Sequence, residues 1–215
     1  MFDIGAQVGQ YSLFAAKLGH HVLAVEPFED NILRIHKAVH MENLQDKVIL
    51  IKNALSHKRN DILLLEKDKQ NVGGQTLLNE NNINKIKYSR SEMATNKYLV
   101  ETIFMDDLID YIPLNKYGKR YEKAVIKIDI EGFEPFAFDK CKKLFETYNV
   151  QMIFMELVVL KDKQQLLEDY FNRMLAFLYS SKLEPFSVDN NPLARKTKFD
   201  DNVEWPRDVI WRKKL

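Results

Sequence analysis

Three residues near the start of the chain have the types and spacing of a ligand-binding loop. Asp3, Gly5 and Gly9 lie between a short apolar run and the beginning of a helical pattern. Open parallel sheets bind their ligands at the carboxyl ends of the strands, where such a loop would stand. Glycines there let the backbone approach a ligand closely. The carboxylate of Asp3 suits a ligand with positive charge rather than a pyrophosphate.

Glu26 is the second candidate for ligand binding. It ends the next apolar run, 17 positions beyond Gly9, and Pro27 follows it. An acidic residue at this place can accept hydrogen bonds from both hydroxyls of a ribose. S-adenosylmethionine combines a ribose with positive charge on an ammonium and a sulfonium group. The spacing D-x-G-x-x-x-G lacks the third glycine of the dinucleotide fingerprint, which counts against the alternative of a nucleotide-dependent oxidoreductase.

A group of charged residues marks a third candidate site. Lys127, Asp129 and Glu131 share one face of a predicted strand if that strand persists so far, and Glu156 ends the strand predicted beside it. These carboxylates repel one another unless a cation, a proton or Lys127 compensates. Asp129 could then be a general base for a hydroxyl acceptor. The alternatives are a divalent cation held by the three carboxylates or a purely structural network.

The first half of the chain predicts the framework that positions these residues. Short apolar runs alternate with helical patterns, which indicates right-handed crossovers and a parallel sheet. The first helix has apolar residues at Leu13, Phe14, Ala16 and Leu18. The predicted strands are 2–4, 22–25 and 48–51, and the predicted helices are 9–17 and 30–43.

The second half continues the alternation after an insertion at 58–96. We expect this insertion to hold a hairpin, with a strand at 61–66 and a turn at Gly73-Gly74, and a polar loop over 79–96. The later strands are predicted at 101–105, 125–130 and 152–157, and the helices at 135–148 and 163–181. The runs 184–188 and 208–211 should form a hairpin that makes the last strand antiparallel. We therefore predict one α/β domain over residues 1–215.

Composition and charge limit the classes of partner. The 215 residues include 32 basic and 31 acidic side chains, a net charge of +1, so we expect no nucleic-acid partner. No apolar run approaches the roughly 18 residues of a membrane span. Cys141 is the single cysteine, and no cluster of thiolates can bind a metal. Because Met1 leads directly into a strand, we expect the first strand to be truncated. A cytoplasmic location is the default unless an upstream targeting segment is missing.

The order of these motifs resembles the FkbM family of S-adenosylmethionine-dependent methyltransferases over nearly the whole chain. The string I-K-I-D-I-E-G-F-E at 126–134 is the most specific part of the resemblance. The other matching segments are 2–9, 24–27, 53–56, 73–74, 105–108 and 154–156. The resemblance implies a Rossmann-like, seven-strand methyltransferase sheet. It also implies methyl transfer from S-adenosylmethionine, typically to a hydroxyl oxygen of an acceptor such as a small molecule or a glycan.

The resemblance also implies roles for single residues. Asp3, Gly5 and Gly9 would line the methionine end of the cofactor, and Glu26 would hold its ribose. Asn53 and Ala54, just past the third strand, would flank the adenine. Gln7 stands where the family usually has asparagine, which puts cofactor affinity in question. This departure and the short first strand favour the alternative of a catalytically silent binding protein, whereas the presence of Asp3, Glu26 and Asp129 counts against it.

Overall fold

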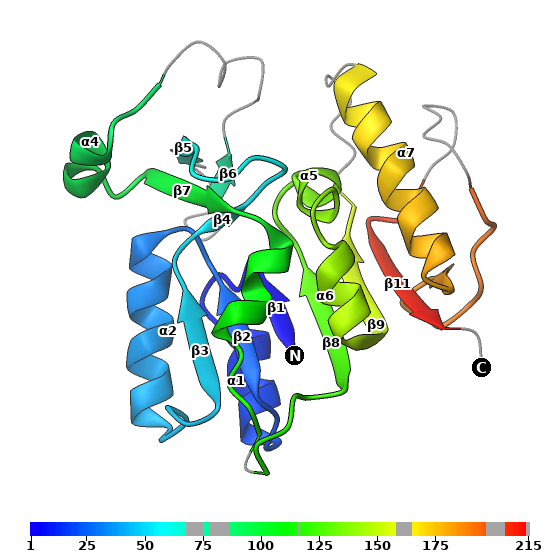
Figure 1. Cartoon of the computed structure of the whole chain (residues 1–215), viewed down its shortest axis with the longest axis horizontal. Helices are drawn as coiled ribbons and strands as arrows, with labels where there is room; N and C mark the ends of the chain where they lie inside the picture. Colours follow the sequence, from blue (N-terminus) through cyan, green and yellow to red (C-terminus); the bar gives the residue numbers. More distant parts are fainter. Residues whose placement is uncertain (68–74, 78–86, 116, 158–164, 197–204, 214–215) are drawn as a thin grey trace. The chain divides into compact units, whose positions relative to one another are not determined.

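The computed structural model describes residues 1–67, 75–77, 87–115, 117–157, 165–196 and 205–213. The chain divides into two compact units, Met1–Phe104 and Met105–Leu215 (Figure 1). The predicted insertion at 58–96 lies within the first unit. That residues 1–215 act as a single methyltransferase domain stays a prediction.

The first unit begins with the predicted alternation of strands and helices. Strands β1, β2 and β3 pair in parallel, with Phe2 opposite Leu23 and Leu23 opposite Ile49. The elements of this part are β1 (Phe2–Ile4), α1 (Gln10–Lys17), β2 (Val22–Val25), α2 (Glu29–Met41) and β3 (Val48–Ile51). Because the strands are parallel, β1 and β2 both end at the edge where Gly5 and Glu26 follow.

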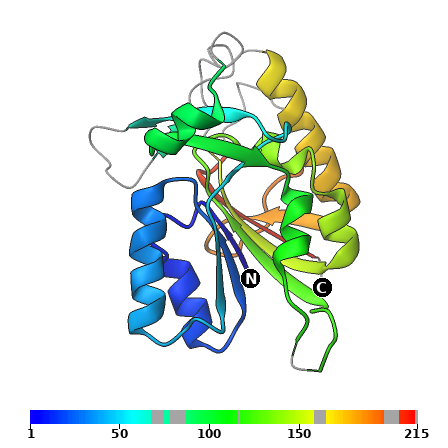
Figure 2. The same ribbon diagram turned by 60° about the vertical axis from the view of Figure 1, so that its left-hand side comes forward.

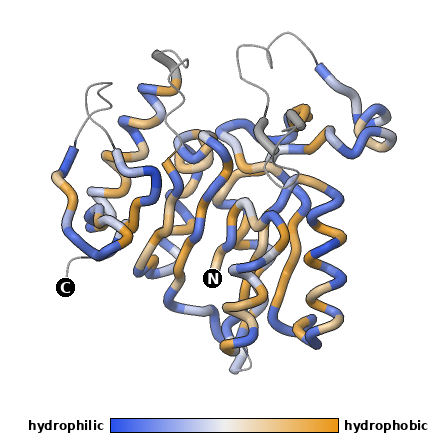
Figure 3. The backbone as a smooth tube through the Cα atoms, turned by 180° about the vertical axis from the view of Figure 1, so that it is seen from behind, coloured by the Kyte–Doolittle hydropathy of each residue, from blue (hydrophilic) through white to orange (hydrophobic). Residues whose placement is uncertain are grey.

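Helices α1 and α2 cover the same side of these strands (Figure 2). The core between these two helices and the strands is built from small and branched side chains, among them Ala15, Ala16, Ala24 and Ile35. Along α2, hydrophobic and hydrophilic residues alternate, as expected of a helix with one buried face (Figure 3). Phe14 of α1 and Leu18, the residue directly after α1, are exposed, because α1 turns its small residues toward the strands.

A second group of strands completes the first unit. Its strand order is β4-β7-β5-β6, with the β4–β7 pair parallel and the other pairs antiparallel. The predicted polar loop is wrong in part, since residues 90–95 form a helix whose Ser89 and Glu92 make a capping box. Residues 73 and 74 lie outside the described part. The elements are β4 (Ala54–Leu55), β5 (Ile62–Lys67), β6 (Gln75–Leu77), α4 (Arg90–Thr95) and β7 (Leu99–Ile103).

The described part of the second unit contains four more strands. Strands β8 and β9 are parallel, whereas β11 pairs antiparallel with both β9 and β10, so the predicted C-terminal hairpin is confirmed. The elements are the 3-10 helix η1 (Met105–Tyr111), β8 (Lys123–Ile128), α5 (Glu134–Phe138), α6 (Lys142–Thr147), β9 (Asn149–Glu156), α7 (Gln165–Ser180), β10 (Leu183–Phe186) and β11 (Asp208–Lys213).

Two predictions for the second unit need correction. The single helix expected over 135–148 is two short helices, because the backbone leaves the helical conformation at Cys141, whose φ is −125° and ψ is 0°. The Cys141 thiol donates to the Phe138 carbonyl at 3.0 Å across this break. The strand expected over 125–130 ends at Ile128. Asp129 therefore follows the strand, and the alternation of side chains does not extend to Glu131.

The predicted fold class is confirmed. Strands β1, β2 and β3 of the first unit and β8, β9, β10 and β11 of the second are the seven strands of a Rossmann-like α/β fold. Most are parallel, and the last strand is antiparallel. Within the described residues, every helix is too short or too polar to cross a bilayer.

Gly9 is the position where the fold depends most on glycine. Its φ is +82°, and an added Cβ would lie 3.0 Å from Cγ1 of the fully buried Ile35. We expect Gly9→Ala to lower the free energy of unfolding by about 2–4 kcal/mol, from backbone strain together with overpacking. Gly19 is a matched control, since its φ is +88° but a Cβ added there would meet no atom within 4 Å. Urea unfolding of both alanine variants measures the difference. Equal losses would show that the contact with Ile35 contributes nothing.

Candidate functional site

The loop between β1 and α1 is held against the end of β2 by backbone hydrogen bonds. The amides of Gly5 and Ala6 both donate to the carbonyl of Val25, at 2.9 and 3.1 Å. Gly5, Gln7 and Gly9 adopt positive φ values of 73°, 51° and 82°. The loop therefore winds through left-handed backbone, in which glycine is unstrained and glutamine is less favourable than asparagine.

Glu26 joins this loop to the start of α2. Its Oε2 accepts the backbone amide of Gln7 at 2.8 Å, and its Oε1 accepts the amide of Phe28 at 2.9 Å. The side-chain amide of Asn31 also donates to Oε1, at 3.4 Å. The carboxylate is buried, with 4% of the residue exposed. Its position is thus set by three protein donors before any ligand arrives.

The side chain of Asp3 is held in place by a residue of α1, the helix that follows the loop. The residue is fully buried, and Oγ of Ser12 on α1 donates to its Oδ2 at 2.5 Å. A buried carboxylate at the end of β1 places negative charge beside the glycine loop. The structure thus brings Asp3, Gly5, Gln7, Gly9 and Glu26 to one edge of the first unit. Their contact with a cofactor stays a prediction.

Asn53 and Ala54 lie in a different setting. Ala54 is buried in β4, opposite Thr102 of β7. The side-chain amide of Asn53 donates to the carbonyl of Glu101 at 3.0 Å. This contact ties the chain after β3 to β7. Contact of these residues with an adenine stays a prediction.

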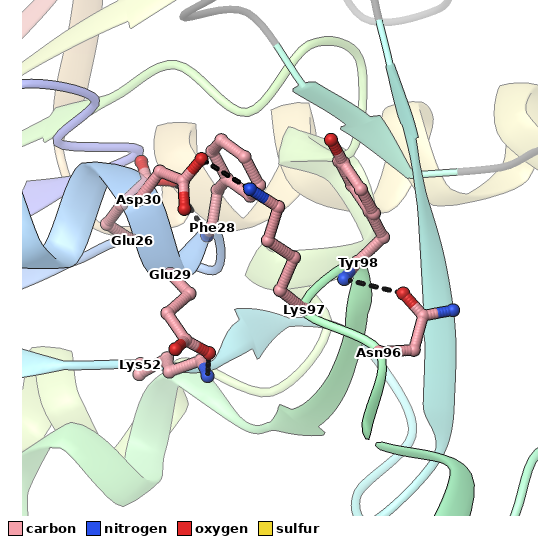
Figure 4. Close-up of polar contacts among 8 residues, drawn as sticks. All are labelled: Glu26, Phe28, Glu29, Asp30, Lys52, Asn96, Lys97 and Tyr98. Atoms are coloured by element: carbon pink, nitrogen blue, oxygen red, sulfur yellow. Dashed lines mark hydrogen bonds and ion pairs between the residues drawn. The ribbon is translucent and has the colours of Figure 1, made fainter. Parts of the chain in front are cut away.

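Aromatic and charged side chains pack beside Glu26 (Figure 4). Phe28 and Tyr98 stack with ring centroids 5.4 Å apart and an interplanar angle of 20°. Nζ of Lys97 lies 5.5 Å from the Phe28 centroid and forms an ion pair with Asp30 at 2.7 Å. These contacts hold the segment before β7 against the segment after β2, and so support the backbone to which Glu26 is bonded.

The second unit brings together three of its four predicted site residues at the ends of β8 and β9. Nζ of Lys127 lies 3.5 Å from Oδ2 of Asp129. Burial raises the pKa of Glu156, and the nearby charge of Asp129, with which it also shares a hydrogen bond, raises it further. Arg207 forms an ion pair with Glu156 Oε1 and opposes this shift. Glu156 therefore keeps its proton to higher pH than an ordinary glutamate does.

Glu131, the fourth predicted residue, lies in the turn after β8 with a φ of 56°. It is close enough for its charge to act on both Glu134 and Arg207. Within the described residues, no group of three or more histidine, cysteine, aspartate or glutamate side chains has an arrangement that could hold a metal ion. The described geometry thus gives no support to the alternative in which three carboxylates bind a cation.

Glu134 is a site residue that the sequence analysis did not single out. Its side chain is buried, with 1% of the residue exposed, and its Oε1 accepts the amide of Ile130 at 2.7 Å. Burial raises its pKa to about 8, and the charges of Asp129 and Glu131 act in the same direction. Glu134 ends the string I-D-I-E-G-F-E and directly precedes Pro135, and this position is the feature of the sequence that could have identified it.

Ser12, Asn31 and Arg207 were also missed. Ser12 and Asn31 are polar residues within helical patterns, and only their burial against Asp3 and Glu26 shows their part in the site. Arg207 meets Glu156 across 51 positions of sequence, so no local pattern could reveal it.

Comparisons with known proteins identify the family and the fold. A family model described as the methyltransferase FkbM domain matches residues 3–184. The solved structure of methyltransferase FkbM from Methylobacillus flagellatus KT superposes with a TM-score of 0.53 at 12% identity, over 99% of this chain and 42% of that one. The chain thus spans less than half the length of that protein. A search among curated proteins found no significant match.

Two further solved structures superpose with lower scores. One is precorrin-6y C5,15-methyltransferase from Geobacter metallireducens GS-15, with a TM-score of 0.45 at 14% identity over 100% of this chain and 80% of that one. The other is an rRNA methylase from Streptococcus thermophilus, with a TM-score of 0.45 at 10% identity over 100% of this chain and 86% of that one.

Proposed function

Because the chain belongs to the methyltransferase FkbM family, we propose that it uses S-adenosylmethionine to methylate a hydroxyl oxygen of a small molecule or a glycan. The observation that carries this proposal is the bond between the glycine loop and Glu26, through the amide of Gln7 at 2.8 Å. It joins, at one edge of the first unit, a glycine-containing loop and a carboxylate suited to ribose hydroxyls. The substitution of glutamine for the family's asparagine leaves this contact intact, since the backbone makes it.

The donors and acceptors at this edge fit the cofactor. Glu26 supplies carboxylate oxygens for ribose hydroxyls, and its three protein donors hold it in place. Asp3 supplies buried negative charge beside the loop, which favours an ammonium or a sulfonium. Gly5 supplies backbone without a side chain at the end of β1. An organised carboxylate binds with less loss of entropy than a mobile one.

The residues of the second unit suit deprotonation of a hydroxyl. When bound, S-adenosylmethionine supplies an electrophilic methyl group on its sulfonium. We assign to Asp129 the removal of the proton from the acceptor oxygen. Burial and the nearby charge of Asp129 raise the pKa of Glu156, so the neighbour of Asp129 stays protonated to higher pH than an ordinary glutamate does. Lys127, 3.5 Å from Asp129 Oδ2, offsets the negative charge of the pair.

A methyl-transfer assay tests this proposal. The full chain would be incubated with methyl-tritiated S-adenosylmethionine and a panel of hydroxyl-bearing small molecules and oligosaccharides. We expect label in at least one acceptor, with an equal amount of S-adenosylhomocysteine. Cofactor that binds without any transfer across the panel would favour a catalytically silent binding protein. Binding of NADH in place of S-adenosylmethionine would favour an oxidoreductase. The expectation that nucleic acid is not an acceptor is tested by including an RNA in the panel.

A further inference from the structure

We propose that Glu134 is a positioning residue whose buried carboxyl holds the turn after β8 and so fixes where Asp129 and Glu131 lie. This inference rests on the proposed function, in which Asp129 acts on the acceptor. Glu134 itself is assigned no contact with the acceptor or the cofactor. It acts through the backbone of the turn.

The geometry of the turn carries the inference. Strand β8 ends at Ile128 and α5 begins at Glu134, so five residues reverse the chain. Glu131 and Gly132 take successive φ values of 56° and 90°. The amide of Ile130 donates to Glu134 Oε1 at 2.7 Å, while the carbonyl of Ile130 accepts the amide of Phe133 at 3.3 Å. Both polar groups of Ile130 are thus used to close the turn.

The anchor of this turn is rigid because Glu134 stands on a buried helix. All five residues of α5 are buried, and the ring of Phe136 contacts Tyr170 of α7 at a centroid distance of 4.7 Å. A carboxyl that projects from this packed helix reaches back to the peptide directly after Asp129. The left-handed conformation of Glu131 is unfavourable for a residue with a side chain. The bond from the Ile130 amide to Glu134 is one of the contacts that oppose its relaxation.

The protonation state of Glu134 decides which substitutions test the hydrogen bond. Burial raises its pKa to about 8, and the charges of Asp129 and Glu131 contribute. Near neutral pH the group is therefore mainly a neutral carboxylic acid, whose carbonyl oxygen still accepts a hydrogen bond. Glutamine has the same size and the same acceptor. If the hydrogen bond is what matters, Glu134→Gln should retain the turn, whereas leucine fills the space without an acceptor.

The experiment compares Glu134→Gln, Glu134→Leu and Glu134→Asp in the full chain by amide hydrogen exchange at neutral pH. We expect the Ile130 amide to exchange about 10-fold faster or more in the leucine and aspartate variants, and within about twofold of wild type in the glutamine variant. Glu146→Gln is a control, because Glu146 is an exposed helical residue that pairs with Lys142 on the same helix. The aspartate variant keeps the test valid if leucine prevents folding.

Two outcomes would overturn the proposal. One is a wild-type exchange rate for Ile130 in a folded leucine or aspartate variant. The other is a glutamine variant that exchanges as fast as these two. Titration with S-adenosylmethionine separates this result from the proposed function, since the glycine loop and Glu26 belong to the first unit. A wild-type chain that binds no cofactor would contradict the proposed function alone. Normal cofactor binding, together with a wild-type exchange rate of the Ile130 amide in the leucine and aspartate variants, would overturn the role of Glu134 alone.

Discussion

Replacing Glu26 with alanine is expected to weaken binding of S-adenosylmethionine by about 2–3 kcal/mol, roughly 30- to 150-fold. The variant loses a charged acceptor for the ribose hydroxyls. It also removes the acceptor of the Gln7 and Phe28 amides, which hold the loop and the start of α2. Because buried donors are costly to leave unpaired, we expect the free energy of unfolding to fall by about 2–4 kcal/mol as well.

The matched control for this change is Glu29→Ala. Glu29 lies three residues further on, is partly exposed and pairs with Lys52 at 2.5 Å. Exposed ion pairs contribute about 1 kcal/mol or less, so this variant should keep both its stability and its affinity. Calorimetric titration and urea unfolding measure the two effects separately. A folded Glu26→Ala chain that binds the cofactor as wild type does would refute the ribose assignment.

Asp129→Asn is expected to lower turnover by about 10²–10⁴-fold, the usual contribution of a general base, and to leave cofactor binding unchanged. Asparagine keeps the size of the side chain but cannot take the proton of the acceptor. The substitution also removes a negative charge that raises the pKa of Glu156. We therefore expect the pKa of Glu156 to fall in the variant, which carboxyl NMR can follow without an acceptor.

Asp110→Asn serves as the control for this substitution, since Asp110 is an exposed aspartate of η1 in the same unit. Turnover is measured with an acceptor found by the methyl-transfer assay, and cofactor binding by calorimetry. Unchanged turnover in Asp129→Asn would contradict the general-base assignment. Loss of cofactor binding in this variant would instead place Asp129 in the cofactor site.

The cofactor side of the site was predictable because its signals are local. Gly5, Gly9 and Glu26 each directly follow a short apolar strand or precede a helix, so their place at the sheet edge follows from the order of elements. Their partners were not predictable. Asn31 and Ser12 look like ordinary helical residues, and only packing shows that they bond to Glu26 and Asp3.

The acceptor side was less predictable because it depends on where a strand ends. Apolar alternation gave no sign that β8 stops at Ile128, or that Glu131 enters a left-handed turn. The break at Cys141 has no glycine or proline to announce it. In contrast, the capping box of Ser89 and Glu92 was present in the sequence, and the polar composition around it led to the loop prediction.

Calorimetric titration of the purified full chain with S-adenosylmethionine, with NADH as the comparison ligand, tests the central claim most directly. It requires no knowledge of the acceptor and measures cofactor binding directly. We predict saturable binding of S-adenosylmethionine at micromolar concentration and no binding of NADH. A folded chain that gives no heat with S-adenosylmethionine, or one that binds NADH instead, would contradict the account.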